Sequence, residues 1–78
     1  MSNATVESQQ TEIRILLNGE PRTVPQGLTI ERLLPWLEID PSKVAVELNR
    51  EIIRKADWGV SQVQDGAQVE VVWFVGGG

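Results

Sequence analysis

The chain has 78 residues, 41% of them hydrophobic and 23% charged, and its eleven Asp and Glu outnumber its seven Lys and Arg for a net charge of −4. It contains no His and no Cys, which excludes imidazole bases, thiolate nucleophiles, disulfides and Cys/His zinc sites. The length allows one small domain, and an acidic chain lacks the basic face that nucleic-acid binding requires.

Residues 1–11 are polar and have no hydrophobic period, so we expect a disordered N-terminal segment before a domain of residues 12–75. This segment lacks the basic-then-apolar layout of a signal peptide. The longest apolar run, residues 71–75, is far shorter than the roughly 20 residues of a membrane-spanning helix. We therefore expect a cytoplasmic protein that does not associate with membranes.

A β-hairpin is predicted first. Apolar residues alternate with their neighbours at Ile13, Ile15 and Leu17, which is typical of a strand. Asn18-Gly19 then gives a strong turn signal, so residues 22–24 are expected to pair back before Pro25.

A short helix follows. Thr29 is a suitable N-cap and Glu31 places a negative charge in the first turn. Pro35 removes a backbone hydrogen bond, so the helix is expected to be short or distorted near its end. One apolar stripe at helical spacing is formed by Ile30, Leu33, Leu34 and Leu37.

The second half of the chain predicts three more strands. After a turn at residues 40–42, Val44, Val46 and Leu48 alternate with their neighbours, and Asn49-Arg50 separates them from residues 51–54. Residues 55–63 show no clear period. Asp65-Gly66 predicts a tight turn before a last strand over residues 68–75.

This order predicts an α+β fold: a two-layer, ubiquitin-like β-grasp domain with a mixed sheet and one main helix. A single helix covers one face of a sheet, which gives two layers. The compact solution places the first and last strands side by side and parallel in the middle, with the helix in the crossover between them. Other two-layer folds stay open on pattern alone.

The chain ends in Gly76, Gly77 and Gly78 directly after an apolar strand. A glycine end is often a frayed terminus or a linker remnant. Alternatively, residues 76–78 form a flexible tail whose α-carboxylate, with an ordinary pKa of roughly 3.3–3.7, is an acceptor for adenylation. Glycines suit that role because a bare backbone can thread a narrow channel to a bound nucleotide.

Several segments resemble the ThiS family of sulfur carriers in thiamine biosynthesis. They are residues 44–52 (VAVELNREI), Trp58, residues 64–66 (QDG) and residues 74–78 (FVGGG), within a similarity that covers residues 13–78. The glycine end and the Asp-Gly turn are shared with the small subunit of molybdopterin synthase, whereas residues 44–52 are more typical of ThiS. Many family members end in two glycines rather than three.

The resemblance implies a carrier that is not itself an enzyme. A ThiF-like adenylyltransferase would use ATP to activate the carboxylate of Gly78. A persulfide sulfur donor would convert it to a thiocarboxylate, and a ThiG-like thiazole synthase would take the sulfur. The chain would bind no cofactor of its own. Two alternatives stay open: a MoaD-like carrier for molybdopterin or another acceptor, and a ubiquitin-like interaction module with an inert tail.

A partner-docking patch is predicted on the open side of the sheet, at Leu16, Val72 and Phe74. Val69, Val71 and Trp73 would then face the helix. Isolated exposed apolar residues are common, so ordinary exposure is the alternative. Trp36 and Trp58 are expected to be core or covering residues, and the basic residues Arg50, Arg54 and Lys55 form either a solvated hairpin edge or a contact for an acidic partner.

Overall fold

The computed structural model describes residues 11–75. The predicted disordered segment, except for Thr11, and the predicted tail at Gly76, Gly77 and Gly78 lie outside the described residues. In residues 11–75 no helix has the length and apolar character needed to cross a membrane.

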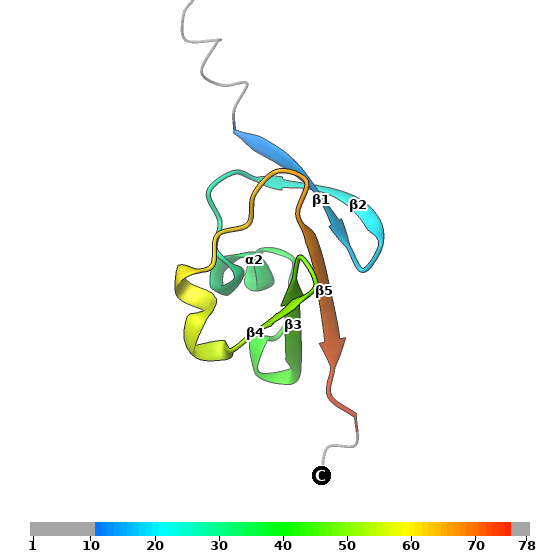
Figure 1. Ribbon diagram of the computed structural model, residues 1–78, viewed down its shortest axis with the longest axis vertical. Helices are drawn as coiled ribbons and strands as arrows, with labels where there is room; N and C mark the ends of the chain where they lie inside the picture. The colour runs from blue at the N-terminus through cyan, green and yellow to red at the C-terminus, as the bar shows by residue number, and fades with distance from the viewer. Residues whose placement is uncertain (1–10, 76–78) are drawn as a thin grey trace, which may run out of the picture.

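Five strands form one mixed sheet in the order β2-β1-β5-β3-β4 (Figure 1). Only β1 and β5 run parallel, and all other neighbours are antiparallel. The predicted β-grasp arrangement is confirmed, with the first and last strands side by side. The strands are β1 Glu12–Leu17, β2 Glu20–Pro25, β3 Val44–Leu48, β4 Glu51–Ile53 and β5 Gln68–Trp73.

The helix α2, Ile30–Trp36, covers one face of this sheet. The Thr29 hydroxyl caps it by accepting a hydrogen bond from the Arg32 amide at 3.4 Å. Pro35 lies in the last turn and the helix ends one residue later, as predicted. The predicted stripe forms the centre of the core, with Ile30, Leu33 and Leu34 fully buried and Leu37 partly buried.

Two short 3₁₀ helices complete the fold, η1 at Pro41–Lys43 and η2 at Lys55–Val60. The sequence predicted a turn at η1 and no element at η2. The buried Trp58 anchors η2, because its ring N–H donates to the Ile53 carbonyl at 3.0 Å and the Lys55 ammonium lies 5.5 Å from the ring centre.

The core lies between α2, η2 and one face of the sheet. Each of the three central strands contributes every second residue to it, as the period of a strand requires. Its buried members are Ile13, Ile15, Val24, Ile30, Leu33, Leu34, Val44, Val46, Trp58, Val63, Ala67, Val69 and Val71.

The last strand is shorter than predicted. We expected it to reach Val75, but β5 ends at Trp73. The reason lies in its neighbour: Trp73 pairs with Val44, the first residue of β3, so no further strand residue is available. A single hydrogen bond from the Phe74 amide to the Lys43 carbonyl, at 2.9 Å, continues the contact.

Candidate functional site

The strand β5 leads to the predicted glycine tail, so the residues that hold and flank β5 form the candidate site. Two asparagines in left-handed conformation, Asn18 with φ 51° and Asn49 with φ 53°, hold this strand from opposite sides. The Asn18 side chain accepts from the Val71 amide at 2.7 Å and donates to the Val71 carbonyl at 3.3 Å. The Asn49 side chain accepts from the Gln68 amide at 2.9 Å.

Backbone bonds reinforce both contacts. The amide of Asn18 donates to the Val69 carbonyl at 2.8 Å, and that of Asn49 donates to the Gln68 carbonyl at 2.7 Å. Each asparagine therefore extends the ladder of a neighbouring strand past its last residue. The sequence indicated both asparagines as turn residues but gave no sign that their side chains bind β5.

The open face of the sheet, the one without a helix, carries all three predicted docking residues. Leu16 of β1 is 38% exposed, Val72 of β5 is 56% exposed and Phe74 is 64% exposed. The predicted exposure is confirmed, whereas docking itself stays a prediction. By strand alternation the central part of the open face consists of Leu16, Ala45, Glu47, Ile52, Gln68, Glu70, Val72 and Phe74.

Ile52 of β4 is a further apolar residue of the open face that the sequence analysis did not single out. It is 75% exposed and pairs with Glu47 of β3. Strand alternation could have indicated the exposure of Ile52, because two neighbouring residues of a strand point to opposite faces. In the structure Ile53 packs against the core, which leaves Ile52 on the open face.

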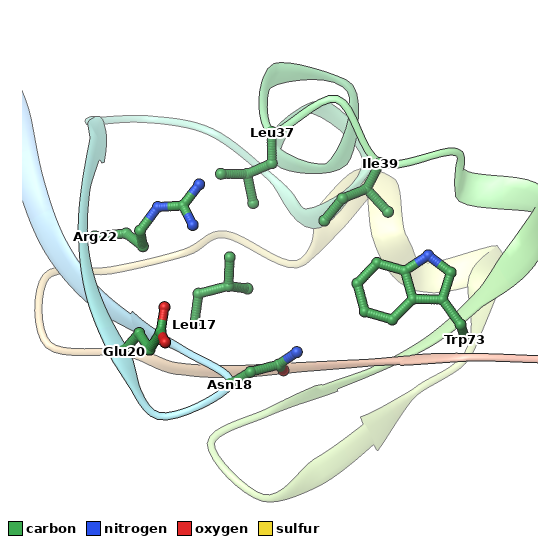
Figure 2. A pocket seen from close by; sticks show the side chains of 7 residues that line it. All are labelled: Leu17, Asn18, Glu20, Arg22, Leu37, Ile39 and Trp73. Carbon is green, nitrogen blue, oxygen red and sulfur yellow. The ribbon is translucent and has the colours of Figure 1, made fainter.

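Trp73 lies on the helix side of β5, as predicted, but it is only half covered. Figure 2 shows its ring at one end of a hollow of about 380 Å³ between the β1–β2 turn and the segment after α2. Leu17, Leu37 and Ile39 supply apolar side chains to this hollow, and Asn18, Glu20 and Arg22 supply polar ones. The end of β5 therefore exposes an aromatic ring on each face, Trp73 on one and Phe74 on the other.

The other residues singled out from the sequence lie apart from β5's end. Trp58 is a core residue as expected, whereas Trp36 is half exposed at the end of α2. Arg50, Arg54 and Lys55 are all exposed around β4 and the start of η2, which fits both a solvated hairpin edge and a contact for an acidic partner.

Metal-ligating groups and the contacts of Asp40 complete the description of the titratable residues. Within residues 11–75 there is no group of three His, Cys, Asp or Glu side chains that could hold a metal ion. The backbone amide and hydroxyl of Ser42 donate to the Asp40 carboxylate at 3.0 and 2.8 Å and lower its pKa from 3.8. This contact caps η1 and is structural.

Comparison with known proteins gives a consistent result. The model of the ThiS family matches residues 15–78. A thiazole synthase of Magnetococcus marinus is 44% identical over 66 residues, which cover 85% of this chain and 20% of that protein. The sulfur carrier protein ThiS of Escherichia coli K12 is 29% identical over 66 residues, covering 85% of this chain and all of that protein.

A solved structure agrees with these matches. The crystal structure of the thiamine biosynthesis protein ThiS from Geobacter metallireducens superposes with a TM-score of 0.75 at 35% identity, covering 85% of this chain and all of that one. The chain spans about a fifth of the length of the thiazole synthases that it matches, so the likeness concerns one part of those proteins. The match to the family model and the shared fold together establish that the chain belongs to the ThiS family.

Proposed function

We propose that this protein is a sulfur carrier for the formation of the thiazole of thiamine, with the carboxylate of Gly78 as the point of attachment. The observation that carries the proposal is the match to the ThiS family, which extends through the glycines to residue 78. The names of the thiazole synthases among its relatives favour thiazole over molybdopterin as the destination of the sulfur.

The chemistry follows from the carboxylate. A carboxylate oxygen attacks the α-phosphorus of ATP and displaces pyrophosphate, which gives an acyl-adenylate. The terminal sulfur of a persulfide then attacks the carbonyl carbon and expels AMP, leaving an acyl disulfide. A second thiol of the donor attacks the donor's own sulfur in that S–S bond, which leaves the donor as a disulfide and releases the thiocarboxylate.

The domain contributes position rather than catalysis. A ThiF-like adenylyltransferase would bind and use ATP, a sulfurtransferase would supply the persulfide, and a ThiG-like thiazole synthase would accept the sulfur. The role left for the chain is to present its end at a fixed distance from a docking surface, because acceleration by proximity depends on such placement. The open-face residues Leu16, Val72 and Phe74 are the proposed docking residues, on the strands β1 and β5 and just after β5.

Intact-mass analysis tests the attachment. The 78-residue protein, incubated with the cognate adenylyltransferase, ATP and a persulfide donor, should exchange one oxygen for sulfur. Fragmentation should place that sulfur on Gly78. A reaction without ATP is the control and should leave the mass unchanged. Sulfur on any other residue, or no activation at all, would contradict the proposal.

A further inference from the structure

Two acidic side chains face each other on the open face. Glu47 of β3 and Glu70 of β5 are register partners in the antiparallel pair. Both point away from the helix, because their neighbours Val46 and Val71 are buried on the other side. Side chains directly opposite on antiparallel strands have Cβ atoms about 4.5–5.5 Å apart. The register therefore places these two acidic side chains at directly facing positions on the same side of the sheet.

Nothing in the described part of the chain neutralises this pair. Within residues 11–75, neither Glu47 nor Glu70 makes a hydrogen bond or an ion pair through its side chain. Arg50 and Gln68 line the same hollow as the two glutamates, yet Arg50 forms no ion pair with either. Like charges directly opposite destabilise a sheet, and Glu47 is partly buried, which weakens screening by water and salt. The isolated domain therefore carries an unrelieved repulsion.

The surroundings of the pair are apolar and exposed. Ile52 pairs with Glu47 on its other side, and Val72 is the next open-face residue of β5 after Glu70. Phe74 follows at the end of that row, on the side where the chain continues to the tail. An apolar centre with a charged group beside it is the usual anatomy of a specific protein interface, in which the charges fix the register of docking.

Resting on the proposed function, we infer that Glu47 and Glu70 together receive one basic side chain, an Arg or a Lys, from the adenylyltransferase that activates the tail. A cation placed opposite two carboxylates offsets their repulsion, so a basic surface is complementary to this pair. An ammonium or guanidinium group has enough N–H donors for both glutamates at once. The apolar surface beside that basic residue would lie against Val72 and Phe74. A phosphate-rich partner is disfavoured, because the pair would repel it.

Opposite effects on folding and binding distinguish this role from a merely structural one. Glu47→Gln and Glu70→Gln each remove one charge of the pair while keeping the side-chain shape. Glu51→Gln is the matched control, because Glu51 is an exposed residue of β4 that carries the same charge but points to the other side of the sheet from Ile52. All variants are made in the full chain. They are compared by thermal melting and by titration calorimetry with the recombinant adenylyltransferase at low and high salt.

We expect either pair variant to raise the melting temperature of the free protein by about 1–4 °C, because the repulsion is relieved. The same variants should raise the Kd for the adenylyltransferase by about fivefold or more at low salt and flatten its salt dependence. Glu51→Gln should leave the Kd unchanged. Pair variants that bind like the unaltered protein would overturn the inference, and so would variants that melt earlier. Weakened binding to the thiazole synthase alone would overturn the choice of partner.

The failure of this inference is separable from the failure of the proposed function. If the unaltered protein supports pyrophosphate exchange and the Glu47→Gln/Glu70→Gln double variant does so with the same KM, only the role of the pair is refuted. If the unaltered protein supports no exchange, the carrier function fails and the inference fails with it.

Discussion

Replacing Asn18 tests how firmly β5 is held beside β1. The strand β1 ends at Leu17, and the Asn18 side chain takes the place that one more strand residue would have. It makes two hydrogen bonds to the backbone of Val71, at 2.7 and 3.3 Å, both partly buried. Its backbone is left-handed, with φ 51°, a conformation that Asn tolerates better than Ala.

Two losses add in Asn18→Ala. Leaving the partly buried amide and carbonyl of Val71 without these bonds costs about 1–3 kcal/mol. Holding Ala in the left-handed region costs about 1–2 kcal/mol more. A domain of this size has a free energy of unfolding of roughly 4–12 kcal/mol at about 0.05–0.15 kcal/mol per residue. A loss of about 2–5 kcal/mol is therefore a large part of the total and lowers the melting temperature by about 10 °C or more.

Urea denaturation with a matched control separates the two losses. Asn49→Ala places Ala at almost the same φ, 53°, but removes one exposed side-chain hydrogen bond instead of two partly buried ones. The backbone cost is shared, so we expect Asn18→Ala to lose about 1–2 kcal/mol more than Asn49→Ala. Asn18→Gly relieves the backbone but not the lost bonds, and should lie between the unaltered protein and Asn18→Ala. Equal losses at the two positions, or an Asn18→Gly variant as stable as the unaltered protein, would refute the role of the Asn18 side chain in holding β5.

Three further predictions concern the open face, the tail and pH. Phe74→Arg should leave the melting temperature unchanged, because Phe74 is exposed, and should weaken calorimetric binding to the adenylyltransferase; early unfolding would instead place Phe74 in the core. Deleting Gly78 shifts the carboxylate by roughly 3.3–3.6 Å and should greatly reduce pyrophosphate exchange at an unchanged melting temperature, whereas normal exchange would make the third glycine dispensable. Because the pKa of Asp40 is lowered from 3.8 in the folded state, its carboxylate stabilises the fold at higher pH, and this stabilisation is lost as the pH falls through the lowered pKa. In urea denaturation, the difference in unfolding free energy between the unaltered protein and Asp40→Ala should therefore shrink below about pH 4. A difference that does not depend on pH would exclude the Ser42 contact as its source.

The elements that the sequence predicted well are those with a local cause. The stripe of Ile30, Leu33 and Leu34 and the cap at Thr29 are sufficient to place α2, because each signal lies within two helical turns. The turn at Asn18-Gly19 similarly places the first hairpin. The exposure of Val72 and Phe74 followed from strand alternation once Val69 and Val71 were assigned to the core.

What the sequence could not supply depends on contacts between distant segments. Asn18 and Val71 are 53 positions apart, so the second function of that asparagine exists only when β1 and β5 are neighbours. The end of β5 at Trp73 depends on where β3 begins, and not on the apolar run that continues to Val75. The hollow beside Trp73 depends on how far the segment after α2 reaches over the sheet.

The facing position of the two glutamates likewise depends on the pairing of distant segments. Taken alone, Glu47 and Glu70 have the pattern of ordinary solvated strand positions, and neither is predicted from the sequence to belong to a site. Only the register between β3 and β5 places them opposite each other, next to the exposed Val72. A pairwise feature of this kind has no signature in a single strand.

The register of β5 therefore determines both the core and the open face of the domain. Val69 and Val71 stabilise the core, while Glu70 and Val72 form part of the open face between and beside them. A slip of one residue would move each set to the wrong face, which would bury a glutamate and expose the core valines. Two hydrogen bonds oppose such a slip from both sides: the Gln68 amide donates to the Asn49 side chain, and the Val71 amide donates to the Asn18 side chain. For a carrier that must present its end at a fixed distance from its docking face, that register is the quantity that the fold has to protect.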